Sequence, residues 1–176
     1  MDFIVKRASE EDFGAIFALL KESFPTDEYR PERGQRALFK RDEYTVLGAY
    51  ASSGELLGIA ALFDLGSFTF IEHLAVFRKY RSGGIGSAIL TSLLERIDGQ
   101  IYLEVEHPTD DVKRRRIAFY ERNGFSKTAY AYNQPAFTPD GGEVPLLVMS
   151  RHPIPSAEEF LKDKAAIFRV VYGKTI

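Results

Sequence analysis

Apolar residues follow two different periods along this chain, and each period predicts a type of element. In residues 13–20 and 160–171 they recur every three or four positions, which is typical of an amphipathic helix. Shorter runs rich in aliphatic and aromatic residues, bounded by Gly, Ser and Pro, predict strands. The strands are expected at residues 3–7, 44–50, 56–65, 68–76, 101–106, 125–132 and 144–150, and the helices at 9–24, around 37–39, 85–97, 109–123 and 156–172.

The connections between these strands predict how they pair. Residues 44–76 hold strands joined by short loops such as Ala51–Glu55, which favours antiparallel pairing. A helix joins the strand at 68–76 to the strand at 101–106, so these two are expected to run parallel. The sequence therefore predicts an α/β fold built on a mixed sheet.

Polar residues at the expected helix ends support these boundaries. Ser9 with Asp12, and Ser156 with Glu159, have the spacing of a capping pair, in which a hydroxyl accepts a hydrogen bond from a backbone N–H of the first turn. Thr109 is expected to cap the helix that follows it.

Composition and charge narrow the class of protein. A length of 176 residues with 45% hydrophobic and 27% charged residues suits one globular domain. The net charge of −2 argues against a general nucleic-acid binder, and the absence of cysteine excludes thiolate catalysis and Cys-ligated zinc. No apolar run approaches the roughly 18 residues of a membrane span, and the N-terminus lacks a signal-peptide layout. A cytoplasmic protein with no membrane, nucleic-acid or metal partner is expected.

The run Arg81-Ser82-Gly83-Gly84-Ile85-Gly86 lies between an apolar strand and a helix. The first N–H groups of a helix have no partner inside it, and glycines let a ligand approach the backbone, so this turn is a candidate phosphate site. The alternative is a glycine-rich turn that holds no ligand. The run lacks the Gly-Lys-Ser/Thr of a Walker loop, and Ile89 stands where a dinucleotide-binding fingerprint has its third Gly or Ala.

A second motif, Phe119-Tyr120-Glu121-Arg122-Asn123-Gly124-Phe125, lies at the expected end of a helix. Together with the glycine turn and the preceding Leu74-Ala75-Val76, it resembles the GNAT superfamily of N-acetyltransferases. The resemblance implies a mostly antiparallel sheet, with a parallel pair at 68–76 and 101–106 splayed around the cofactor and helices on both faces. It covers residues 1–151 as one domain. Residues 152–176 are expected to be a helical extension that packs on this domain, with pairing to a second subunit as an alternative.

The resemblance also implies roles for individual residues, with acetyl-CoA as co-substrate. Tyr120 is expected to protonate the departing thiolate, a role that suits a phenol. The backbone near Leu74 is expected to hold the thioester carbonyl. The cofactor-binding residues that it implies are Leu74, Ala75, Val76, Arg81, Ser82, Gly83, Gly84, Ile85, Gly86, Ser87 and Phe119.

One position departs from the family pattern. Lys113 stands seven residues before Tyr120, where the family often has Asn. The basic run 113–116 is expected to be a solvated helix face, and a contact from one of its side chains to the 3′-phosphate of coenzyme A is the alternative.

A carboxylate is the candidate general base, because an amine must lose a proton before it attacks a thioester. Glu104 matches a position that serves as base in some ribosomal-protein acetyltransferases of the family. Glu72 is the second candidate, because period-two alternation places it on one strand face with Leu74. His73 points to the other face and is expected to be structural.

Family analogy places the acceptor site under the segments 24–33 and 132–143. Acidic residues at 72, 104 and 106 favour a cationic acceptor. The predicted function is transfer of an acetyl group from acetyl-CoA to a primary amine, either a small molecule or a peptide, by direct attack. The alternative is a non-catalytic acyl-CoA-binding regulatory module. The candidate acceptor contacts are Glu28, Tyr132, Gln134 and Phe137.

Overall fold

The computed structural model describes residues 2–154 and 156–175 and divides the chain into two compact units. The N-terminal unit comprises Met1–Asp64 and Ile71–Asp98, and the C-terminal unit comprises Leu65–Phe70 and Gly99–Ile176. Three residues within the expected segments 1–151 and 152–176, namely Met1, Pro155 and Ile176, lie outside the described residues. The expected boundary after residue 151 stays a prediction.

Antiparallel strands form the sheet of the N-terminal unit. Strand β1 (Phe3–Arg7) pairs with β2 (Tyr44–Ala51), and β2 pairs with β3 (Leu56–Asp64) across a tight hairpin. Strand β4 (Phe68–Val76) follows β3 in the sheet, and its residues from Ile71 onward belong to this unit. The short loops therefore produce the antiparallel order that their length predicts.

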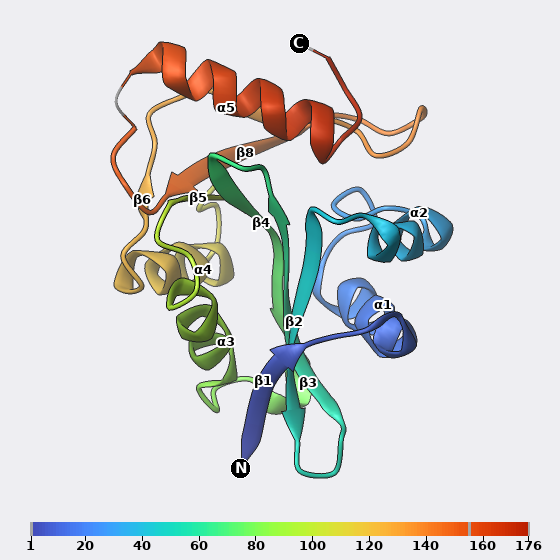
Figure 1. The fold of residues 1–176 in the computed structure, drawn as a ribbon. Coiled ribbons are helices and arrows are strands. Elements are labelled where there is room, and N and C mark those ends of the chain that lie inside the picture. Colours follow the sequence, from blue (N-terminus) through green and yellow to red (C-terminus); the bar gives the residue numbers. More distant parts are fainter. Residues whose placement is uncertain (1, 155, 176) are drawn as a thin grey trace. The chain divides into compact units, whose positions relative to one another are not determined.

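Helices cover both faces of this part of the sheet (Figure 1). Helices α1 (Phe13–Ser23) and α2 (Glu32–Ala37) lie on one face, and α3 (Ile85–Leu94) lies on the other. Short 3-10 turns flank these helices: η1 (Glu10–Asp12) precedes α1, η2 (Leu38–Lys40) follows α2, and η3 (Arg78–Tyr80) lies between β4 and α3. The apolar stripes of α1 and α3 are buried, and these stripes consist of Phe13, Ile16, Leu20, Ile85, Ile89, Leu90 and Leu93.

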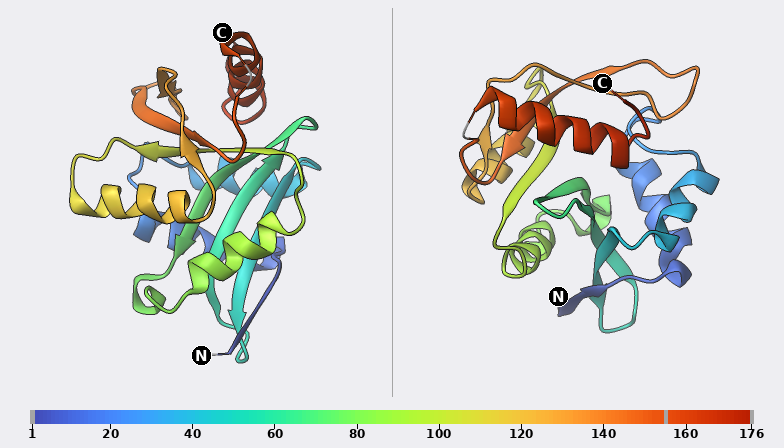
Figure 2. Two further views of the ribbon diagram at one scale, coloured as in Figure 1. Left: turned by 90° about the vertical axis from the view of Figure 1, so that its left-hand side faces the viewer. Right: turned by 45° about the horizontal axis from the view of Figure 1, so that its top comes forward.

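The C-terminal unit is built around β5 (Gln100–Glu106) and β8 (Val144–Ser150), which pair antiparallel. Helix α4 (Asp111–Arg122) and helix α5 (Ala157–Val170) lie on opposite sides of these strands (Figure 2). The first residues of β4 belong to this unit as well, and the ring of Phe68 contacts that of Tyr102 in β5 at 5.2 Å between centroids.

The strand order is β1-β2-β3-β4-β5-β8-β6, with β7 paired to β8. The sheet is mixed, and its parallel pair is β4 with β5. The predicted fold class is therefore confirmed. Within residues 2–154 and 156–175, no helix has the length and hydropathy that crossing a membrane requires.

The strand expected at 125–132 is wrong in one respect, because the chain forms two short strands there. Strand β6 (Ser126–Lys127) and strand β7 (Tyr132–Gln134) both pair with β8. Lys127 lies opposite Met149, and Tyr132 lies opposite Leu146. The chain therefore advances five residues from Lys127 to Tyr132 while β8 spans only three, from Leu146 to Met149. The extra residues loop out of the ladder, as in a bulge.

The expected caps are largely confirmed. Ser9 and Asp12 form a reciprocal capping box on η1, and the Ser156 hydroxyl accepts a hydrogen bond from the Glu159 N–H at 3.1 Å. The cap of α4 is Asp110 rather than Thr109, because the Asp110 carboxylate accepts from the Lys113 N–H at 2.9 Å.

Replacing Gly58 by Ala is expected to destabilise the N-terminal unit. A Cβ at this position in β3 would lie 2.8 Å from the Ala75 carbonyl oxygen in β4, so the two strands would have to move apart. We expect Gly58→Ala to lower the free energy of unfolding by about 1–3 kcal/mol in urea denaturation. Gly14→Ala is the control: a Cβ there meets nothing within 4 Å in helix α1, so stability should stay equal or rise.

Candidate active site

The glycine turn leads into α3 through an unusual backbone conformation. Ser82 and Gly84 have φ angles of +68° and +76°, and Gly84 occupies the N-cap position with no side chain to cap the helix. The Ala88 N–H donates to the Gly84 carbonyl at 3.0 Å, which leaves the amides of the first helical turn without partners inside α3. Residues 81–84 are exposed. Amides arranged in this way can bind an anion, and the phosphate site stays a prediction.

The guanidinium of Arg81 braces this turn. Its Nε donates to the Val76 carbonyl at 2.9 Å, and its Nη2 donates to the Ser23 hydroxyl at 3.4 Å. The side chain thereby ties the start of the turn to the end of β4 and to α1. Arg81 therefore has a structural role in this turn, whether or not it also contacts a phosphate.

The end of β4 alternates between the two sides of the sheet. Leu74 and Val76 are half-buried, and Ala75 between them is buried. The Phe77 N–H donates to the Leu57 carbonyl at 3.0 Å, so the chain stays attached to β3 where the strand ends.

Glu72 lies in a buried ion pair, which sequence reasoning did not foresee. Arg30 Nη1 lies 2.5 Å from Glu72 Oε1, and the two side chains are 11% and 3% exposed. His73 Nδ1 lies 3.4 Å from Glu72 Oε2. Burial opposes the charge of Glu72, but the Arg30 guanidinium and His73 outweigh it and lower the pKa to about 2. A carboxylate held in this way is a weaker base than an ordinary one.

The same cluster fastens the segment after α1 to β4. His73 Nε2 donates to the Glu28 carbonyl at 2.9 Å, and the His73 ring contacts that of Phe24 at 4.8 Å between centroids. His73 is thus structural, as expected from its strand face. Through Arg30, Glu28 and Phe24, a linker that sequence analysis assigns to the acceptor side is attached to β4.

Tyr120 is a buried residue in the last part of α4, and its ring packs between Phe119 and Phe125. Burial raises the pKa of Tyr120 to about 12, although Arg116 acts in the opposite direction. The phenol therefore keeps its proton at neutral pH, as a proton donor must. Phe119 is half-buried beside it.

Glu104 in β5 accepts hydrogen bonds from two tyrosines. The Tyr132 hydroxyl donates to Oε1, and the Tyr172 hydroxyl donates to Oε2 at 2.7 Å. The Tyr172 ring contacts that of Phe137 at 5.1 Å between centroids. Burial and the Glu104 charge raise the pKa of Tyr132 well above its ordinary value, so that phenol remains a donor.

The expected acceptor contacts come from different elements. Tyr132 and Gln134 lie in β7 and are buried, whereas the sequence assigned Gln134 to a loop. Phe137 follows in the loop before β8 and meets Tyr172. In the N-terminal unit, the backbone of Glu28 accepts from His73.

The expected concentration of negative charge is reduced by pairing. Glu106 lies 3.0 Å from Arg116 and 3.3 Å from Lys113, and Glu72 is paired with Arg30. Lys113, the position that departs from the family pattern, thus binds the end of β5. Because Glu72 and Glu106 are paired with cations, the three carboxylates favour a cationic acceptor less than the sequence indicates.

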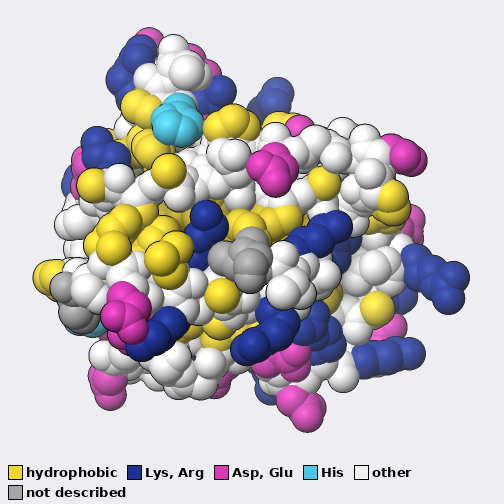
Figure 3. Space-filling model, turned by 90° about the horizontal axis from the view of Figure 1, so that it is seen from above, with side chains coloured by type: hydrophobic (Ala, Val, Ile, Leu, Met, Phe, Trp, Pro, Cys, Tyr) yellow, Lys and Arg dark blue, Asp and Glu magenta, His cyan; other side chains and the backbone are white. Residues whose placement is uncertain are grey.

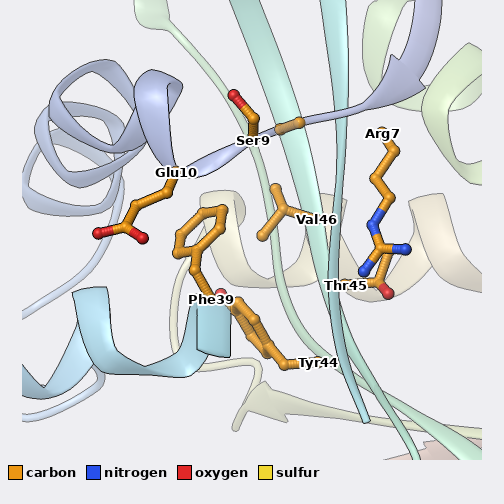
Figure 4. Close-up of a pocket in the computed structure, with 8 residues that line it drawn as sticks. Arg7, Ser9, Glu10, Phe39, Tyr44, Thr45 and Val46 are labelled. Atoms are coloured by element: carbon orange, nitrogen blue, oxygen red, sulfur yellow. The ribbon is translucent and has the colours of Figure 1, made fainter. Parts of the chain in front are cut away.

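One face of the surface and one pocket can be compared with the candidate residues. Figure 3 shows Lys and Arg side chains interspersed with Asp and Glu on the face it draws. A pocket of about 380 Å³ in the N-terminal unit contains none of the candidate residues, and its Phe39 and Tyr44 rings contact each other (Figure 4). Over the described parts of the chain, no cluster of His, Asp and Glu could hold a metal ion.

The sequence profile of the acetyltransferase (GNAT) family matches residues 12–125. The chain belongs to the GNAT family. It is therefore an acyltransferase of a family that uses acetyl-CoA and acts on amine acceptors. Among curated proteins, no sequence matches this chain.

Solved structures of GNAT proteins share the fold. A Bacteroides thetaiotaomicron protein assigned to the GNAT family has 27% sequence identity and a TM-score of 0.87, over 98% of this chain and 99% of that one. The Escherichia coli ribosomal-protein-S18-alanine N-acetyltransferase has 20% identity and a TM-score of 0.66, over 85% and 92% of the two chains. The PaiA N-acetyltransferase of Thermoplasma acidophilum, solved with coenzyme A, has 18% identity and a TM-score of 0.62, over 87% and 100%.

Two residues around the GNAT motifs escaped sequence analysis. Arg30 lies 42 positions from Glu72 in a polar linker, and Tyr172 lies 68 positions from Glu104 beyond the family match. Neither stands in a motif. The only signal in the sequence was the assignment of the 24–33 linker to the acceptor side.

The buried ion pair predicts how the stability of this GNAT protein depends on pH. Because the pKa of Glu72 is about 2 in the folded protein and near its ordinary 4.5 when unfolded, its stabilising contribution is present above 4.5 and lost as pH falls towards 2. The free energy of unfolding should therefore fall over this window, and less steeply in Glu72→Gln. Denaturation at a series of pH values measures both slopes; equal slopes would show that the ion pair does not set the dependence.

Proposed function

We propose that this GNAT protein transfers an acetyl group from acetyl-CoA to a primary amine by direct attack of the amine on the thioester. The uncapped first turn of α3 carries the proposal, because oriented amides at a helix N-terminus are suited to a pyrophosphate. Direct attack agrees with a chain that contains no cysteine to carry the acyl group.

The residues of the N-terminal unit that would hold acetyl-CoA fit that ligand. The backbone from Ser82 to Ser87, Ile85 included, would bind the pyrophosphate, and Gly83, Gly84 and Gly86 have no side chain that could cover the amides. The backbone of Leu74, Ala75 and Val76 would bind the pantetheine arm, and Phe119 of the C-terminal unit would contact it by family analogy. Acetyl-CoA supplies the activated acyl group.

Two side chains of the C-terminal unit are assigned the proton transfers. Glu104 accepts one proton from the acceptor ammonium, and the nitrogen releases a second to solvent when the amide has formed. Tyr120 donates its proton to the leaving sulfur and regains one from solvent, so the reaction releases one proton in total. Glu72 is the second choice for the base, because its ion pair with Arg30 lowers its pKa.

The acceptor is proposed to be a small molecule or a peptide with a primary amine. Glu28, Tyr132, Gln134 and Phe137 are its candidate contacts. Membership of a family that acts on amines supports this assignment.

Replacing Gly84 by Val should weaken acetyl-CoA binding at least tenfold in isothermal titration calorimetry. A β-branched residue resists a φ of +76°, and its side chain would stand where the phosphate approaches the backbone. Gly54→Val is the matched control, because Gly54 in the β2–β3 hairpin has a φ of +86° and equally open surroundings. Both variants should lose similar stability, and only Gly84→Val should lose affinity. Equal affinities would refute the phosphate assignment.

Replacing Tyr120 by Phe should lower kcat about a hundredfold or more and leave acetyl-CoA affinity nearly unchanged. The substitution removes only the phenolic proton donor, and a general acid contributes on the order of 10²–10⁴ in rate. Single-turnover kinetics and calorimetry measure the two effects separately. Normal turnover in Tyr120→Phe would remove this residue from the mechanism.

A panel of primary amines incubated with acetyl-CoA tests the activity itself. Free coenzyme A can be followed with a thiol reagent, and the absence of cysteine means that the protein adds no background. Acetyl-CoA binding with no transfer to any amine would instead favour the regulatory module.

A further inference from the structure

Helix α5 and the turn after it lie beyond the part of the chain that the family profile matches. In the C-terminal unit, α5 is attached to the strands by side chains from several positions. The Tyr102 hydroxyl of β5 donates to Asp163 of α5 at 2.7 Å. The ring of Phe160 stacks on that of Tyr130 at 4.4 Å between centroids. Helix α5 is thus fixed along its length before the chain reaches Tyr172.

The last of these contacts joins the turn after α5 to the Glu104 carboxylate of β5. Tyr172, just after α5, donates to Oε2, and Tyr132 of β7 donates to Oε1. The ring of Phe168 in α5 contacts that of Tyr132 at 5.6 Å and that of Tyr172 at 6.1 Å. The two phenols are therefore held by a common aromatic side chain, and each oxygen of the carboxylate receives one of them.

This geometry restricts what Glu104 can do. An ionised carboxylate only accepts hydrogen bonds, with about two acceptor positions on each oxygen. Two donors on different oxygens fix the rotation of the carboxylate plane and favour the anion. Among the charged groups on the adjoining elements, Lys164 lies over the Tyr132 and Phe168 rings, Asp163 accepts from Tyr102, and Glu106 is paired with Arg116.

We propose that Tyr172 and Tyr132 are positioning residues for the base Glu104, and that α5 is thereby part of the catalytic apparatus. The inference rests on the proposed function, in which Glu104 accepts a proton from the acceptor ammonium. The phenols keep their own protons throughout. They hold the carboxylate ionised and in the orientation in which it receives the amine proton.

The test compares Tyr172→Phe with a matched control, Tyr102→Phe. Each variant removes one phenol that donates to a carboxylate and so links β5 to α5 or to the turn after it. Only Tyr172 donates to Glu104, whereas Tyr102 donates to Asp163. With an acceptor found in the amine panel, Tyr172→Phe should lower kcat about tenfold. It should also move the acid limb of the pH–rate profile to higher pH, because the anion loses a donor. Acetyl-CoA affinity should not change.

Tyr102→Phe should lose comparable thermal stability and keep its turnover and pH profile. Equal effects of the two variants, or no effect of either on rate and profile, would overturn the proposal and leave α5 a purely structural element. Tyr132→Phe should reproduce the changes of Tyr172→Phe, so that misfolding of one variant leaves the other to decide.

A second readout separates this inference from the proposed function. In protein labelled with ¹³C at the glutamate carboxyls, Glu104→Gln assigns the Glu104 resonance, which should titrate at higher pH in Tyr172→Phe than in the unmodified protein. If the Glu104 resonance shifts in this way but the protein transfers no acetyl group, the enzyme assignment is refuted and the effect of the two phenols on Glu104 still holds. An unchanged titration would refute the positioning role whatever the activity.

Discussion

The first turn of α3 depends on a backbone conformation that glycine adopts at no steric cost. Because Gly84 has a positive φ and no side chain, the helix begins without a cap, and its first amides remain available. Arg81 holds the turn against the end of β4, so the position of the helix start is tied to the strand before it. A helix end without a cap leaves its first backbone N–H groups without protein partners. This end lies in an exposed loop, where an anion can accept hydrogen bonds from them.

The carboxylates near the GNAT motifs are stabilised in three different ways. Glu72 is buried against Arg30 and His73, Glu106 is paired with Arg116 and Lys113, and Glu104 accepts from neutral phenols. A direct cationic partner stabilises the charge and makes the group reluctant to take a proton, whereas a phenol orients the carboxylate without neutralising it. This difference is the physical reason for assigning proton transfer to Glu104 and attachment of the 24–30 segment to Glu72.

The family profile and the two phenols on Glu104 involve different parts of the chain. The residues 12–125 that the family profile matches contain the glycine turn and Tyr120. Both phenols on Glu104 come from beyond residue 125, from β7 and from the turn after α5. The two phenols therefore lie outside the residues that the family profile matches, whereas the Glu104 that they contact lies within them.

Features that depend on near neighbours along the chain could be predicted from the residues alone. Periodicity gave the strand and helix order, the Ser9 and Ser156 caps were readable three residues away, and the glycine turn and the Tyr120 motif identified the family. Three features became visible only in the folded chain: the bulge that divides the strand at 125–132, the ion pair of Glu72 with Arg30 and the contact of Tyr172 with Glu104. These depend on register and on side chains 42 and 68 positions apart, and periodicity says which face a residue occupies but not which distant residue it meets there.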